Sequence, residues 1–84
     1  MSELEQLRGE VAAADRAILT AVNRRLELVR EIKAHKERSG IGFVDSEQER
    51  RLIEALQREN PGPLSEAGVR ELFERILELV KREL

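Results

Sequence analysis

The sequence predicts an all-α chain of three helices, one of them very long, that assembles as an intimate symmetric homodimer. Apolar residues recur every three or four positions over three segments, which is the period of an amphipathic helix. Glycine- and proline-containing breaks at 39–42 and 60–63 separate these segments, and the first segment is much longer than the other two. Residues 1–84 are expected to form a single domain, because a chain of this length holds only one small core.

The first predicted helix spans residues 3–39, a stretch without proline and with Gly9 as its single glycine. Its apolar residues form one stripe at helical spacing, namely Leu4, Leu7, Val11, Ile18, Val22, Leu28, Val29 and Ile32. A helix of this length extends for about 55 Å. Two shorter helices cannot cover such a stripe, so we expect a second copy of the chain to cover the remainder.

The second predicted helix spans residues 45–59 and begins at Asp45, whose carboxylate can cap the amides of the first turn. Gln48, three residues later, completes a capping box. The apolar face of this helix consists of Leu52, Ile53 and Leu56. The helix ends at Asn60, and the Pro-Gly-Pro sequence at 61–63 predicts a rigid turn.

The third predicted helix spans residues 65–83, with Ser65 as its N-cap. Its core face consists of Val69, Leu72, Phe73, Ile76, Val80 and Leu84. Glu83 falls within the same arc. Its place next to the last residue favours an exposed side chain at a fraying helix end.

Cations interrupt the apolar stripe of the first helix. Arg25 and Lys36 point within roughly 30° of the stripe's centre, and Arg8 lies at its edge beside Asp15. A single arginine on such a stripe usually lays its methylenes on the core and extends its charge to water. Several cations on one helix favour another interpretation, because buried charges are rarely unpaired. We therefore expect Arg25 and Lys36 to bind an anionic ligand.

Two further residues complete the predicted pocket. Glu49 lies on the apolar face of the second helix, where it is either partly exposed at the helix start or directed into the same cavity as the cations. If two long helices pair in antiparallel fashion about residue 19, Arg8 of one chain lies between Arg25 and Lys36 of the other. Guanidinium groups bind carboxylates through paired hydrogen bonds, so the expected ligand carries at least two anionic groups. Glu49 then requires a hydroxyl or another donor on that ligand.

Composition excludes several classes of site. The chain has no cysteine and only one histidine, His35, so a thiolate nucleophile and the usual metal-ligand spacings are missing. A net charge of −2 and few aromatic residues argue against nucleic-acid binding. The sequence contains neither a membrane-spanning run nor a signal peptide, so we expect a cytoplasmic protein. Any reaction would proceed by positioning and electrostatic stabilisation, without cofactor or metal.

The order and spacing of several motifs resemble the all-helical chorismate mutase family, in its small stand-alone bacterial type. The resemblance covers essentially the whole chain and is carried by Leu7-Arg8-Gly9-Glu10-Val11, Asp15, Asn23-Arg24-Arg25-Leu26, Ile32-Lys33-Ala34-His35-Lys36, Asp45-Ser46-Glu47-Gln48-Glu49-Arg50, the turn at 60–63 and Leu72-Phe73. It implies an intertwined dimer that converts chorismate to prephenate by a Claisen rearrangement, in phenylalanine and tyrosine synthesis.

The resemblance also implies roles for individual residues. Arg8 of the partner chain and Arg25 would bind the two carboxylates of the substrate. Lys36 would contact a carboxylate and the ether oxygen as the carbon–oxygen bond breaks. Glu49 would accept a hydrogen bond from the ring hydroxyl, helped by the backbone near Asp45.

The chain departs from the family at three substrate-binding positions. Gln48 replaces a frequent arginine, Val80 replaces a small polar residue, and Leu84 replaces a glutamine or glutamate that meets the ether oxygen. Glu83 would substitute for the missing donor if the helix end shifted. In that position it must be protonated, and burial would raise its pKa in that direction.

Two other functions stay open at this stage. The same scaffold supports isochorismate pyruvate lyase or aminodeoxychorismate mutase activity, and Glu49 carries the discrimination because a carboxylate accepts from a hydroxyl and an amine alike. The apolar Val80 and Leu84 favour a non-catalytic helical dimerisation or regulatory module instead. The resemblance also implies an activating partner enzyme of the shikimate pathway, because small mutases of this kind can be weak alone.

Overall fold

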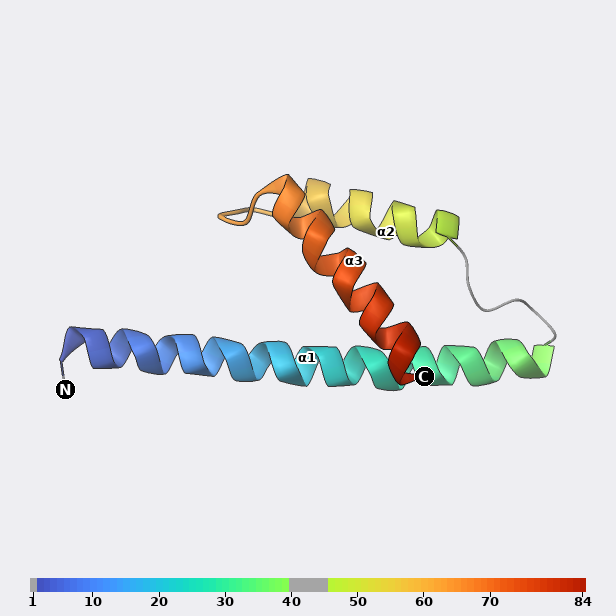
Figure 1. The fold of residues 1–84 in the computed structure, drawn as a ribbon, viewed down its shortest axis with the longest axis horizontal. Coiled ribbons are helices and arrows are strands. Elements are labelled where there is room, and N and C mark those ends of the chain that lie inside the picture. The colour runs from blue at the N-terminus through green and yellow to red at the C-terminus, as the bar shows by residue number, and fades with distance from the viewer. Residues whose placement is uncertain (1, 40–45) are drawn as a thin grey trace.

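The computed structural model describes residues 2–39 and 46–84, and in this part the chain forms three helices and no strand (Figure 1). Helix α1 spans Glu3–Ser39, α2 spans Ser46–Glu59 and α3 spans Glu66–Glu83. The predicted all-α fold with one very long N-terminal helix is confirmed. The N-cap predicted at Asp45 lies outside the described residues.

Helix α1 sets the length of the molecule, whose extents are 57, 24 and 18 Å. Figure 1 shows α3 crossing diagonally from the far end of α2 to the C-terminal half of α1, where the C-terminus lies. Helix α3 packs against both of the other helices. The side chain of Arg30 donates to the main-chain carbonyl of Glu83 at 3.2 Å, so α1 also satisfies one of the free carbonyls at the C-terminal end of α3.

The core of one chain is very small. Among the described residues only Ile53, Val69 and Val80 are buried apolar side chains, and all three lie where α2 and α3 meet or where α3 approaches α1. Leu72, predicted on the core face, is 45% exposed, and this part of the prediction is wrong for a single chain. Helix α1 leaves most of its stripe uncovered, because α2 and α3 reach only part of its length.

Side-chain hydrogen bonds fix the turn and the helix start that position α3. Asn60 accepts from the amide of Gly62 at 3.1 Å and donates to the carbonyl of Leu64 at 2.7 Å. Gly62 has a φ of 83°, a left-handed conformation that favours glycine. Ser65 accepts from the amide of Gly68 at 3.0 Å, which confirms the predicted N-cap. These contacts determine the direction in which α3 returns to α1.

Candidate functional site

A cavity of about 390 Å³ lies where the three helices approach one another. Helix α1 contributes Arg25, Val29, Ile32 and Lys36, which are separated by four, three and four residues. This spacing places all four side chains on one helix face. Arg25 and Lys36 stand about 16 Å apart along the axis and mark the two ends of an apolar floor. Both side chains are half-buried.

Helices α2 and α3 form the facing walls of this cavity. The first turns of α2 contribute Gln48, Glu49 and Leu52. The last two turns of α3 contribute Leu77, Val80, Lys81 and Leu84, again at helical spacing. The cavity therefore has apolar surfaces with a few convergent polar groups, and its size is within the range of small-molecule sites.

The charges of the walls define the kind of ligand that fits. Among the described lining side chains, Arg25, Lys36 and Lys81 are cations and Glu49 is the single anion, so these side chains carry a net charge of +2. A small dianion compensates this charge. The carboxylate of Glu49 also provides an acceptor for a hydroxyl on such a ligand.

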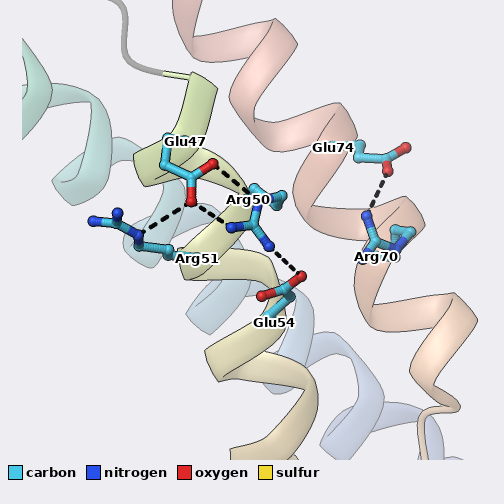
Figure 2. Close-up of polar contacts among 6 residues, drawn as sticks. All are labelled: Glu47, Arg50, Arg51, Glu54, Arg70 and Glu74. Atoms are coloured by element: carbon cyan, nitrogen blue, oxygen red, sulfur yellow. Dashed lines mark hydrogen bonds and ion pairs between the residues drawn. The ribbon is translucent and has the colours of Figure 1, made fainter.

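The contacts of Glu49 differ from those of its neighbours on α2. Arg50 pairs along its own helix with Glu47 and with Glu54, the latter at 2.7 Å, and Arg51 also reaches Glu47 (Figure 2). The hydrogen bonds from Arg50 to Glu47 and Glu54, together with their charges, raise the pKa of Arg50. Glu49 instead crosses to α3, where its Oε1 lies 2.8 Å from Nζ of Lys81.

Of the nine residues predicted for the site, six line this cavity. They are Arg25, Lys36, Gln48, Glu49, Val80 and Leu84. Asp45 lies outside the described residues.

Two predicted site residues lie elsewhere. Arg8 is exposed near the free end of α1, about 25 Å along the axis from Arg25, and does not reach the cavity of its own chain. Glu83 is exposed and is not among the described lining residues, whereas Leu84, the next residue, faces the cavity. The catalytic role predicted for Glu83 therefore lacks support in the geometry of this chain.

Sequence reasoning missed Lys81. The signal that identifies it is its spacing from Leu77 and Leu84, four residues before and three residues after it. These positions share one helix face with Lys81, so an apolar face that continues through a lysine indicates a cavity lining. Leu77, which lies on the same face of α3, was missed as well.

Two other kinds of feature are missing from the described residues. No group of three or more histidine, cysteine, aspartate or glutamate side chains in residues 2–39 and 46–84 is arranged to hold a metal ion. No helix in these two ranges is long and apolar enough to cross a bilayer.

Comparison with known proteins adds three findings. The chorismate mutase type II family matches residues 7–83. A structure of chorismate mutase (form I) from Thermus thermophilus superimposes with a TM-score of 0.91 at 32% identity, covering 94% of this chain and 99% of that one. The form II structure from the same organism gives 0.91 at 31% identity, with 96% and 92% covered. No curated protein sequence matches the chain.

Proposed function

The chain belongs to the chorismate mutase type II family, and we propose that it converts chorismate to prephenate in the cavity between α1, α2 and α3. The activity is that of an isomerase in phenylalanine and tyrosine biosynthesis. We assign this cavity as the chorismate site because its lining side chains carry a net charge of +2 around an apolar surface. Chorismate carries two carboxylates, one ring hydroxyl and an apolar ring, which match these features.

The proposed roles follow the chemistry of each side chain. Arg25 binds one carboxylate through the two parallel donors of its guanidinium group. Lys36 contacts a carboxylate and the ether oxygen of the enolpyruvyl group. Glu49 accepts a hydrogen bond from the ring hydroxyl. Gln48 and the backbone near Asp45 lie beside these groups in the sequence and complete the binding of the polar substituents.

The reaction breaks the ether carbon–oxygen bond while a new carbon–carbon bond forms within the same molecule. Cavity residues neither gain nor lose a covalent bond, so catalysis depends on holding the enolpyruvyl group over the ring and on stabilising the charge that develops on the oxygen. The ammonium group of Lys36 supplies that charge stabilisation. Val29 and Ile32, between the two cations, exclude water from the reacting atoms and so strengthen these interactions.

A second copy of the chain completes the site in this proposal. The side chains of Leu4, Leu7, Val11 and Ile18 are between 51% and 61% exposed in one chain, although they form one apolar stripe. An antiparallel α1 covers this stripe and brings its own Arg8 to the cavity, where it binds the second carboxylate. The support for this arrangement is the length of the uncovered stripe and the distance of Arg8 from its own cavity.

Two remaining expectations stay predictions. A binding experiment is needed to test whether an enzyme of the shikimate pathway activates the chain, and a localisation experiment is needed to test whether the protein is cytoplasmic.

The apolar side chains of Val80 and Leu84 favour a weak or partner-dependent mutase over a fast one, because they leave the ether oxygen without a donor on that side.

The test is a chorismate assay on the purified chain, followed by loss of substrate absorbance. We predict that Lys36→Ala lowers kcat by roughly 10²- to 10³-fold, because it removes an interaction formed mainly in the transition state. The increase in KM is expected to be about tenfold or less. Lys33→Ala is the matched control, since Lys33 lies on the same helix and is not among the described cavity residues.

A variant Lys36→Ala that changes only KM would refute the role of Lys36 at the ether oxygen. A wild-type dimer without turnover on chorismate, both alone and with aromatic-pathway enzymes, would instead support the non-catalytic alternative. Turnover of isochorismate or aminodeoxychorismate in preference to chorismate would support a sister activity.

A further inference from the structure

Lys81 is the one charged side chain of the described cavity lining to which the proposed function assigns no role. Its Nζ lies 2.8 Å from Oε1 and 3.0 Å from Oε2 of Glu49, so one ammonium group contacts both carboxylate oxygens. The Glu49 side chain is 26% exposed and that of Lys81 is 41% exposed. The pair therefore forms a partly enclosed part of the cavity wall.

The fold keeps this pair at a defined place. Glu49 projects from the first turn of α2, and Lys81 from the last turn of α3, between Leu77 and Leu84. Arg70 and Glu74 show the alternative arrangement, an exposed pair within one helix (Figure 2). The Glu49–Lys81 pair differs because it joins two helices and because both of its residues line the cavity.

Pairing with Lys81 changes what Glu49 attracts. A carboxylate without a cationic partner binds a protonated amine more tightly than a hydroxyl, because the hydrogen bond is then assisted by charge on both sides. With Lys81 in contact, the pair is neutral as a whole, although the carboxylate oxygens keep lone pairs for another donor. A hydroxyl still binds, whereas an incoming ammonium group meets the charge of Lys81 at close range.

We propose that Lys81 determines the specificity of the cavity, by favouring a ring hydroxyl over an amine at the position that Glu49 recognises. This inference rests on the proposed function, because it takes Glu49 as the group that contacts the ring substituent. Lys81 thereby selects chorismate against aminodeoxychorismate, in which an amine replaces that hydroxyl. The discrimination comes from like charges placed together, a repulsive element that specific sites commonly use.

The test compares both compounds as substrates of the full-length wild type and of Lys81→Met, which keeps an unbranched apolar stem and removes the charge. We expect the ratio of kcat/KM for aminodeoxychorismate to that for chorismate to rise by roughly two- to fivefold, the range for a partly exposed charge pair. Lys81→Arg restores the cation and is expected to return the ratio to the wild-type value. Arg82→Met removes an exposed neighbouring cation as the control.

Calorimetric binding of the two compounds gives a second readout of the same ratio, which applies even if turnover is too slow to measure. An unchanged ratio in Lys81→Met overturns the proposal, and so does an equal loss of affinity for both compounds, which would make Lys81 a general binding residue. Should Lys81→Met fail to fold, as judged by circular dichroism, Lys81→Gln serves in the same comparison. Absence of chorismate turnover in the wild type refutes the proposed function alone, since the binding ratio still decides the role of Lys81.

Discussion

At the scale of the residue, the cavity combines cations with two apolar side chains at the end of α3. Val80 is buried and Leu84 half-buried, and both line the cavity together with Lys36. Neither side chain can donate a hydrogen bond to the oxygen that gains charge in the proposed rearrangement. In the proposed mechanism Lys36 therefore stabilises that oxygen without help from Val80 or Leu84, and the rate of the enzyme is expected to be limited by this arrangement.

Leu84→Gln tests this limit. The amide group of glutamine supplies a second donor on the α3 side, and a hydrogen bond to a charged oxygen contributes about 1.5–3 kcal/mol, so we predict an increase in kcat of roughly 10- to 10²-fold. Leu84→Met is the control, because it keeps the volume and flexibility of the side chain without adding a donor. Steady-state kinetics on chorismate measure both variants. A kcat that falls or stays constant in Leu84→Gln would show that the oxygen lies elsewhere.

Arg25, Lys36 and Glu49 could be predicted as cavity residues because each places a charge on an otherwise apolar helix face. The spacing of Lys81 from Leu77 and Leu84 places it on the cavity face of α3, but its contact with Glu49 could not be predicted. A lysine in the last turn of a helix has a sufficient explanation in solvation and in the helix dipole, and only the packing of α3 against α2 brings it to Glu49. Contacts between residues far apart in sequence depend on tertiary geometry that the pattern of one helix does not contain.

At the scale of the element, α1 is a helix whose first half has no partner within the described part of the chain. Leu4, Leu7, Val11, Ile18 and Leu19 are all more than half exposed, although the first four share one stripe. Most of the stability of a helix in a protein comes from packing of its apolar face. The first half of α1 therefore requires another surface, and the proposed partner helix supplies it.

Ile18→Glu tests the coverage of α1. A carboxylate near the proposed two-fold axis removes two apolar side chains from the interface, each contributing about 1.5–3 kcal/mol, and it places two like charges together. We predict that the dissociation constant of the dimer rises by about 10²-fold or more. Sedimentation at a series of concentrations measures it. Thr20→Glu, on the opposite face of the helix, should leave the dimer intact, and equal behaviour of the two variants would contradict the proposed interface.

The helices and the turn before α3 could be predicted from the sequence, because the interactions that determine them are formed by residues close together in the chain. Ser65 caps α3 through the amide of Gly68, and Asn60 and Gly62 form the preceding turn, all within a few residues of one another. The exposure of Leu72 could not be predicted in this way. Its position in the 3.6-residue pattern indicates an apolar environment, but the pattern does not specify whether the same chain or another one provides it.

At the scale of the whole molecule, the shape of one chain is incompatible with an independent core. The molecule is 57 Å long and 18 Å thick, and only three apolar side chains are buried among its described residues. Burial of apolar surface within one chain therefore contributes little to the free energy of folding. Domains of this size are already marginal when compact. We therefore propose that two copies of the chain share each site, with Arg8 of one copy acting beside Arg25 and Lys36 of the other.

Mixing two inactive variants tests this claim most directly. Arg8→Ala and Lys36→Ala are each expected to abolish most of the activity, and co-refolding them in equal amounts forms mixed dimers. In a mixed dimer one site contains both lost residues and the other contains neither, so the mixture is predicted to regain about a quarter of the wild-type activity per chain. A mixture no more active than the average of the two separate variants would contradict the account, because Arg8 and Lys36 would then act within the same chain or at different sites.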